Sequence, residues 1–197
     1  MEKLKIYVNG KEYKNIFTRV IWSGAIHGTA RKLEVEYLGD IITNIGDEIV
    51  FSYEDEKLFY GKVFQHSRKG ETEIKSFYAY DNAIYLNKNN FVKNFFKKKP
   101  SEILKKICGE LNLKIGKIPK DEVTCTYPAI DRSGYEIILN AYTIQHRKNK
   151  KVYSIVSNEQ AIDIVEQGTY TDVLLTSADN ISTSSYEEGI ENLINQI

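Results

Sequence analysis

The sequence predicts an α+β protein, mainly β, in which strands fill the first part of the chain and helices enter later. Residues 4–80 show the period-2 alternation of apolar and polar side chains that is typical of strands with one buried face. From Ser101 onward, apolar residues recur at spacings of three and four, which indicates amphipathic helices. The change of period near residue 85 therefore predicts a boundary between a β-domain and an α+β domain.

The strongest β signal lies in residues 46–85. It predicts three strands, at 48–53, 58–65 and 71–80, with the acidic run Glu54–Glu56 in the first turn and Gly70 in the second. Strands joined by short turns pair with their sequence neighbours, so we expect an antiparallel meander with one buried face.

Four shorter strands are expected before this meander, at residues 4–8, 11–13, 17–22 and 31–38. Asn9-Gly10 separates the first two and is the residue pair favoured in a type I′ hairpin turn. Six or seven strands within 82 residues suit a small, strongly twisted barrel or split barrel.

Two helices and a hairpin are expected in the α+β part, after a turn-like polar stretch at 87–90. Pro100 fits the first residue of a helix, because its missing N–H would be unpaired there. Ser133 and Glu136 have the spacing of a reciprocal cap and predict a second helix. The hairpin is expected at 151–157 and 160–165.

The last segment is predicted to be helical, with Ser184 and Glu187 as a further cap. An apolar stripe follows and is the candidate interface of the chain; it consists of Ile190, Leu193, Ile194 and Ile197. Because the stripe runs to the last residue, we expect the next element to lie beyond this sequence.

Charge and composition argue against several classes of protein. The chain has 27 Lys+Arg and 27 Asp+Glu, so it has no net field that would attract nucleic acid or an anionic membrane. It has neither a membrane-spanning apolar run nor a secretory signal, so we expect synthesis and assembly in the cytoplasm. Cys108 and Cys125 are too few for a disulfide framework.

Catalytic and metal-binding patterns are weak. His27, His66 and His146 fall on three different predicted elements, without the spacing of metal ligands. Cys108 lies on the apolar face of the first helix, and no base is visible near Cys125. We therefore predict no catalytic residue, no metal and no cofactor.

The clustered charges are interpreted as solvated. This applies to Asp47-Glu48, Glu54–Glu56 and Asp121-Glu122, whereas Asp131 and Asp163 have no partner that the sequence can place. The basic run 93–99 contains aromatic residues that could stack on bases. A solvated connector before a helix is the favoured interpretation, so no specific nucleic-acid binding and no membrane insertion are expected.

Several segments together resemble the baseplate hub proteins of PBSX-like prophages, contractile phage tails and phage tail-like particles. They cover nearly the whole chain in the expected order: WSG (22–24), RKLEV (31–35), GDEIVFSY (46–53), KLFYGKV (57–63), AYDNAIYLNKNN (79–90), PSEILKKICGELNLKIG (100–116), IILNAYT (137–143), KVYSI (151–155) and ISTSSYEEGIENLINQI (181–197). Lys99 departs from the family, which often has a threonine cap there, so a weaker helix start is expected.

The resemblance implies a structural, non-catalytic subunit that joins the tail tube to the central spike. It implies a homotrimeric ring in the baseplate of a virion or tail-like particle, with the tube protein, the spike and neighbouring baseplate proteins as partners. It also implies a tube-like β-domain, residues 1–82 with 170–197, interrupted by an inserted α+β domain at 83–169.

Two other functions remain open from the residues alone. A stand-alone carbohydrate- or protein-binding β-module would present an aromatic platform near Trp22 or Tyr53. A cell-wall hydrolase would need a Cys–His pair, or two carboxylates that face one cleft.

Overall fold

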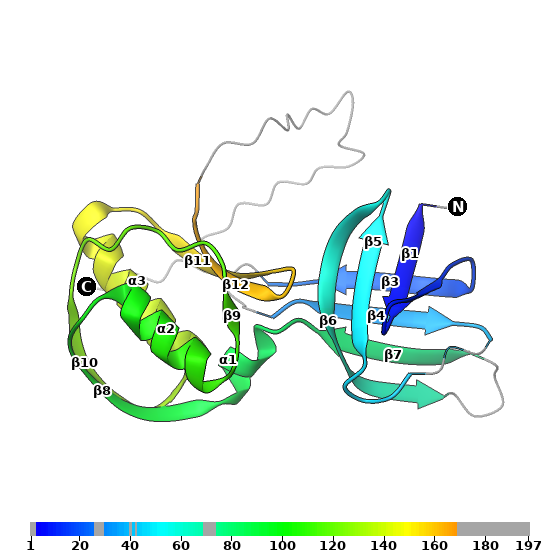
Figure 1. The fold of residues 1–197 in the computed structure, drawn as a ribbon, viewed down its shortest axis with the longest axis horizontal. Helices are drawn as coiled ribbons and strands as arrows, with labels where there is room; N and C mark the ends of the chain where they lie inside the picture. Colours follow the sequence, from blue (N-terminus) through cyan, green and yellow to red (C-terminus); the bar gives the residue numbers. More distant parts are fainter. Residues whose placement is uncertain (1–2, 26–29, 40, 42, 69–73, 169–197) are drawn as a thin grey trace, which may run out of the picture. The chain divides into compact units, whose positions relative to one another are not determined.

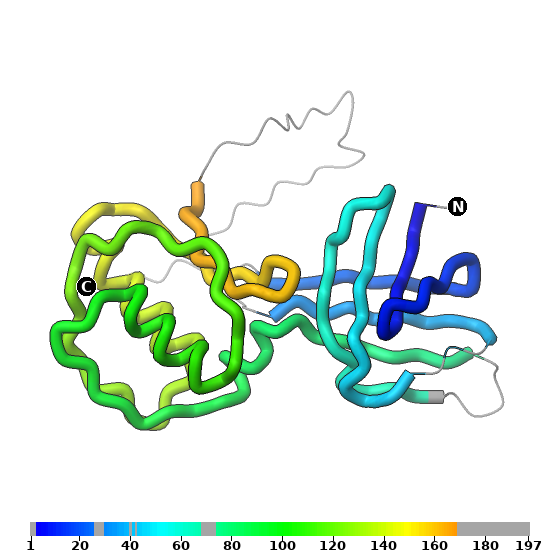
Figure 2. Tube along the Cα trace, viewed as in Figure 1, coloured from blue at the N-terminus to red at the C-terminus, as the bar shows by residue number. Residues whose placement is uncertain are grey.

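The computed structural model describes residues 3–25, 30–39, 41, 43–68 and 74–168 (Figure 1; Figure 2). These residues confirm the mainly β, α+β class. No helix in this part is long and apolar enough to span a membrane. In chain order, the elements are β1 (Leu4–Val8), β2 (Lys11–Tyr13), β3 (Phe17–Ser23), β4 (Lys32–Tyr37), β5 (Glu48–Tyr53), β6 (Glu56–Arg68), β7 (Lys75–Tyr80), α1 (Ile84–Lys88), β8 (Asn90–Lys98), α2 (Pro100–Glu110), β9 (Lys114–Ile115), β10 (Cys125–Ser133), α3 (Gly134–Asn149), β11 (Tyr153–Asn158) and β12 (Ala161–Glu166).

The first seven strands form one antiparallel sheet in the order β2-β1-β5-β6-β7-β4-β3. The expected meander β5-β6-β7 is confirmed at its centre. Pairing of β1 with β5 and of β4 with β7 then places the earlier strands on either side of the meander. Within the described residues β2 and β3 remain the edges, so the sheet is open and the expected closure into a barrel is not seen there.

Two turns use left-handed backbone conformations. Asn9 (φ 47°) and Gly10 (φ 81°) form the hairpin turn predicted from this residue pair. Glu54 (φ 49°) and Asp55 (φ 67°) take the same region between β5 and β6. Their carboxylates reach the ammonium groups of two lysines on the N-terminal segment, Lys3 and Lys5. The acidic run is therefore a hairpin turn with lysine partners.

One face of this sheet carries the first hydrophobic core. Alternate residues of β1, β4, β5 and β7 are buried, as the period-2 pattern predicts, whereas the edge strands β2 and β3 have no fully buried residue. The buried residues are Ile6, Val8, Leu33, Val35, Tyr37, Ile41, Ile49, Phe51, Phe59, Val63, Phe77 and Ala79.

The second core belongs to residues 83–164. Here α2 packs against α3, beside a two-stranded ribbon (β10-β8) and a three-stranded sheet (β11-β12-β9). The buried apolar residues are Ala83, Leu86, Phe95, Ile103, Leu104, Ile107, Cys108, Cys125, Ala129, Ile137, Ile138, Ala141, Tyr142, Tyr153, Ile155, Ile162 and Ile164. Residues 170–197 lie outside the described part, so their pairing with residues 1–82 stays a prediction.

Both long helices begin with side-chain caps. The Glu136 carboxylate accepts the Ser133 N–H at 2.9 Å, and Ser133 Oγ accepts the Glu136 N–H at 3.2 Å, which confirms the predicted reciprocal cap. At α2, the Glu102 carboxylate accepts the Lys99 N–H at 2.8 Å. Asp121 accepts both the N–H and the hydroxyl of Ser101, at 2.9 and 2.6 Å. The loop carboxylate thus compensates for the missing threonine cap.

The expected turn at 87–90 and the solvated Asp121 are wrong, and the structure supplies the partners of Asp163 and Asp131 that the sequence could not place. Residues 87–90 are not a turn, because α1 ends at Lys88 and β8 begins at Asn90. Asp121 is a helix cap, and Asp163 is buried, where it accepts the Lys117 N–H at 2.8 Å and the Asn158 amide at 3.1 Å. Asp131 accepts the Asn90 amide at 2.9 Å.

The nine-residue strand β10 is a further element that the sequence did not predict. It contains Pro128, which cannot donate a backbone hydrogen bond. A proline is tolerated at this place because β10 pairs with β8 alone in its sheet, so its other side is an edge.

Gln145 is a fully buried polar residue on α3. Its Oε1 accepts the Glu122 N–H at 3.0 Å, and its Nε2 donates to the Lys120 carbonyl at 3.1 Å and the Tyr153 hydroxyl at 3.2 Å. Because buried polar groups are tolerated when they are hydrogen-bonded, this side chain anchors the loop before β10 to α3.

Two tyrosines of the second core make a matched test of hydroxyl pairing. The Tyr142 hydroxyl is buried and has no partner among the described residues, whereas the Tyr127 hydroxyl donates to the Ile137 carbonyl at 2.7 Å. Removing an unpaired buried hydroxyl relieves a desolvation cost, so Tyr142→Phe is expected to raise the free energy of unfolding by up to about 1 kcal/mol. Tyr127→Phe is expected to lower it by about 1 kcal/mol. Urea unfolding of the two variants measures both, and a larger loss in Tyr142→Phe than in Tyr127→Phe would contradict the assignment.

Candidate functional site

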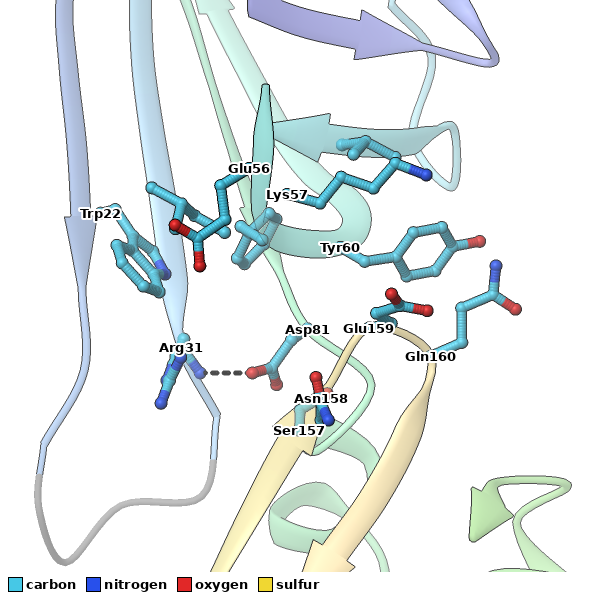
Figure 3. Close-up of a pocket in the computed structure, with 13 residues that line it drawn as sticks. Trp22, Arg31, Glu56, Lys57, Tyr60, Asp81, Ser157, Asn158, Glu159 and Gln160 are labelled. Carbon is cyan, nitrogen blue, oxygen red and sulfur yellow. Dashed lines mark hydrogen bonds between the residues drawn. The ribbon is translucent and has the colours of Figure 1, made fainter. Parts of the chain in front are cut away.

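The main candidate site is a cavity of about 340 Å³ within the unit formed by residues up to Gln167. Figure 3 shows its lining: Trp22 comes from β3, Arg31 directly precedes β4, and Asp81 directly follows β7. Val50 of β5, the range Glu56–Tyr60 of β6, and the range Ser157–Gln160 at the end of β11 and the turn to β12 complete it. The cavity thus collects side chains that are far apart in the sequence.

The exposed aromatic of this cavity already has partners. The Arg31 guanidinium lies over the Trp22 ring, 5.2 Å from its centroid, and the Phe51 ring meets Trp22 edge-on at 6.5 Å. Trp22 is 38% exposed. A sugar ring would stack on the face of an aromatic side chain, and the guanidinium occupies one face of this ring. The predicted platform near Trp22 is therefore an internal cation–π pair.

Asp81 is the buried acid of the cavity. Its side chain is only 3% exposed, and burial raises its pKa to about 6 against the opposing effect of two backbone N–H donors. Arg31 N–H donates to Oδ2 and Ala83 N–H to Oδ1, both at 3.0 Å. Since each oxygen is engaged by the backbone, the carboxyl group positions the chain where β7 ends and α1 begins.

Charges of both signs surround the rest of the cavity. Glu56 and Glu159 face it together with Lys57, as Figure 3 shows. The Ser157 hydroxyl is buried without a partner among the described residues. The Asn82 amide donates to the Gln160 carbonyl at 3.3 Å and holds the β11–β12 turn beside the end of β7. This lining therefore has no uniform charge.

The cysteines and histidines considered for catalysis lie in surroundings that do not activate them. Cys108 and Cys125 are buried, and burial raises the pKa of both thiols, that of Cys108 to about 11. Few thiolates therefore form near neutral pH. His146 Nδ1 lies 3.1 Å from the Lys151 carbonyl, and His66 lies on β6 opposite Phe77. In the described ranges, no cluster of His, Cys, Asp and Glu could hold a metal ion.

The basic run before α2 places some of its aromatic side chains in the second core and exposes another to solvent. Phe95 is buried and Phe91 is half-buried in the second core, whereas Phe96 is 67% exposed. The Lys93 ammonium pairs with Glu110 at 2.8 Å. A base-stacking surface would need several aromatic side chains facing outward, and here a single one does so.

The candidate interface residues Ile190, Leu193, Ile194 and Ile197 lie outside the described residues. Sequence reasoning missed Asp81 and the whole cavity. An aspartate just after a strand, with a backbone donor two residues on, is a common turn motif and could have pointed to Asp81. Its second donor, Arg31, is 50 residues away, and no local pattern reports such a pairing.

Comparison with known proteins identifies relatives of this chain. A family model described as YQBQ-like matches residues 20–197. No curated protein matches the chain. Among solved structures, it resembles the 43 kDa tail protein of prophage MuSo2 from Shewanella oneidensis, with a TM-score of 0.67 and 11% identity over 83% of this chain and 52% of that one. It also resembles the tail protein from Neisseria meningitidis MC58, with a TM-score of 0.62 and 11% identity over 82% of this chain and 49% of that one. The chain thus spans about half the length of these proteins and shares their fold.

Proposed function

Since this chain belongs to the YQBQ-like family, we propose that it is a structural protein of a phage tail. More narrowly, we propose that it is a non-catalytic subunit of the baseplate hub, where it links the tail tube to the central spike. The observation that carries the proposal is the fold shared with the prophage MuSo2 tail protein over 83% of this chain. The motifs that resemble baseplate hub proteins of PBSX-like prophages support the narrower assignment.

The surroundings of the reactive groups fit a structural use. Asp81 holds two backbone N–H groups, and Asp163 holds one backbone N–H and one amide. The thiols of Cys108 and Cys125 are buried, with raised pKa values. Each of these groups stabilises the local backbone or fills the second core.

The assembly that we propose is a homotrimeric ring in the baseplate of a virion or tail-like particle. In it, residues 170–197 complete the β-domain of residues 1–82, around the inserted domain 83–169. The stripe Ile190, Leu193, Ile194 and Ile197 lies in a contact of the ring. The tube protein, the spike and neighbouring baseplate proteins are the other partners.

Deletion of the gene from a lysogen, followed by electron microscopy of induced particles, tests the tail role. We expect no intact tails, and we expect a tagged copy of the protein to restore them. Gold label on the tag should lie at the baseplate end of the tube only. Normal tails after deletion would refute the tail role, and label along the whole tube would refute the hub position.

Light scattering measures molecular mass in solution and so tests whether the protein forms the proposed homotrimeric ring. The complete gene product is expected to have three times its monomer mass in solution. Replacing Ile190 and Ile194 with Asp should reduce that mass to a monomer without loss of the β signal in circular dichroism. A trimer that survives both substitutions would place the ring contacts elsewhere.

A further inference from the structure

The outward face of the β8–β10 ribbon is apolar, although the fold does not require this. Val92 is 73% exposed, Phe96 67% and Ile130 70%. The register pairs Asn94 with Pro128 and Lys93 with Ala129, and Val92 and Ile130 are the next residues along the two strands, at an irregularity in the pairing. We call the outward side chains of these two strands the ribbon face; they are Val92, Asn94, Phe96, Thr126, Pro128 and Ile130.

The opposite side of the ribbon already supplies its share of the second core. Phe95 and Ala129 are each 2% exposed, and Cys125 is 1% exposed. Since side chains alternate across a strand, the outward positions could be polar without any loss of core burial. Exposed apolar side chains gathered on one face mark surfaces that contact another protein.

The ribbon is also basic in a chain that is neutral overall. Strands β8 and β10 contain four cations, Lys93, Lys97, Lys98 and Arg132, and one anion, Asp131. Lys93 and Arg132 have carboxylate partners on the helices. Lys97 and Lys98 are exposed and have no carboxylate partner in the described ranges, and the Lys97 ammonium lies 5.4 Å from the Phe96 ring centroid.

A hollow adjoins the ribbon along the free edge of β10. Its volume is about 340 Å³, and the lining comes from two elements: Tyr127, Pro128, Ala129 and Arg132 of β10, and Glu136, Ile137 and Asn140 of α3. The hollow is large enough for side chains of a partner. Arg132 and Glu136 form an exposed ion pair at its rim, 3.3 Å apart, so the hollow itself adds no free cation.

From this arrangement we propose that the ribbon face binds a different protein of the tail, one that presents apolar side chains bordered by carboxylates. The inference rests on the proposed tail function and adds to it a surface and the chemistry of its partner. Apolar contact with Val92, Phe96 and Ile130 forms the centre. Carboxylates that meet Lys97 and Lys98 form the border.

The size of the surface agrees with a part of a protein interface. Nine residues at about 3.3 Å each make a ribbon about 30 Å long and, with two strands, about 10 Å wide, or about 300 Å². Each partner in a standard interface buries about 800 Å². The ribbon face therefore forms the apolar centre, and the hollow and the lysines extend it.

Other occupants fit less well. A second copy that paired with the same face would place two sets of unpaired lysines together, which is repulsive. Single-stranded nucleic acid would need several outward aromatic rings, and Phe91 and Phe95 point into the core. A partner protein with acidic borders satisfies both the apolar and the basic parts.

The test uses the complete protein in a lysogen that makes tails. The triple variant Val92→Thr, Phe96→Thr, Ile130→Thr keeps strand-forming residues and should leave the melting temperature unchanged. It is expected to reduce the yield of intact tails about tenfold or more, because central apolar contacts dominate binding. Ile45→Thr, equally exposed at 70% but outside the ribbon, is the matched control and should give normal yields.

A photo-crosslinking residue at position 96 identifies the partner in assembled tails. We expect a cross-link to another tail protein, at a segment that contains Asp or Glu, and we expect Lys97→Glu with Lys98→Glu to abolish it. Cross-links to a second copy, to nucleic acid or to lipid would overturn the proposal, as would normal tails from the triple variant. If gene deletion itself leaves tails intact, the tail function fails; if deletion removes tails but the triple variant keeps them, only the ribbon proposal fails.

Discussion

Replacing Gly61 with alanine is expected to lower the free energy of unfolding by about 3 kcal/mol. Gly61 lies within β6, opposite Ile49 of β5. A Cβ atom at this position would lie 2.3 Å from the Tyr80 carbonyl oxygen and 2.5 Å from the Phe59 ring. The carbonyl belongs to the backbone of the neighbouring strand β7, so the clash cannot be relieved by a side-chain rotation.

Gly109→Ala is the matched control for this substitution. Gly109 lies in α2, and a Cβ atom there would meet nothing within 4 Å. Alanine is a better helix former than glycine, so the variant is expected to gain about 0.5–1 kcal/mol.

Chemical unfolding of the two variants and the parent chain, at one pH and temperature, measures the difference. The expected order of stability is Gly109→Ala, then parent, then Gly61→Ala. A Gly61→Ala variant within about 0.5 kcal/mol of the parent, the range of an ordinary surface substitution, would show that β6 and β7 approach less closely than described.

The sequence predicts the seven-stranded sheet well because one-sided burial leaves a clear period. Strands β1, β2 and β5 have the predicted bounds, and β3 and β4 differ by a single residue at their ends. The turn at Asn9-Gly10 follows from residue chemistry alone. Local rules succeed for the pairs β1–β2, β3–β4, β5–β6 and β6–β7, which are neighbours in the sequence, whereas the pairs β1–β5 and β4–β7 join strands that are distant in the chain.

The ribbon was harder to predict for a physical reason. β10 buries only alternate residues against the helices, and its outward positions include Pro128 and Ile130, so neither a polar outer face nor a continuous apolar run appears. α1 has five residues and β9 two, too few to establish a period. Short elements of this kind are determined by the core around them.

The polar sites also divide into those set by nearby residues, which can be predicted from the sequence, and those set by the tertiary fold, which cannot. The Ser133–Glu136 cap is local and was predicted. Asp121 accepts the N–H of Ser101, 20 residues before it, and Asp163 accepts the N–H of Lys117, 46 residues away. Such carboxylates look solvated in a sequence because their donors are brought near only by the tertiary fold.

Asp81 is expected to make the chain less stable as the pH rises from about 4 to about 6. Its pKa is about 6 in the folded protein and about 3.9 in an unfolded chain. Between these values the folded state holds a proton that the unfolded state has lost, so the free energy of unfolding falls with rising pH. Two pKa units correspond to a loss of at most about 3 kcal/mol, complete above the folded pKa.

The measured quantity is the free energy of unfolding of the parent chain minus that of the Asp81→Asn variant, determined at a series of pH values from 4 to 7. Asparagine can accept only one of the two N–H groups that Asp81 accepts, but this cost does not depend on pH, so the change in the difference isolates the titration. The subtraction is needed because Asp47, Asp55 and Glu136 have lowered pKa values. Their contributions to the free energy of unfolding decrease as the pH falls, which is opposite to the contribution of Asp81.

Asp55→Asn supplies a control of opposite sign. Hydrogen bonding and charge from Lys5 lower the pKa of Asp55, so its parent-minus-variant difference should rise with pH below about pH 4 and stay level above it, whereas the Asp81 difference should fall between about pH 4 and pH 6. A flat or rising Asp81 difference would mean that its carboxylate is ionised in the folded state well below pH 6. The two backbone N–H groups would then outweigh burial, and the junction between β7 and α1 would be held by a charge at every pH in this range.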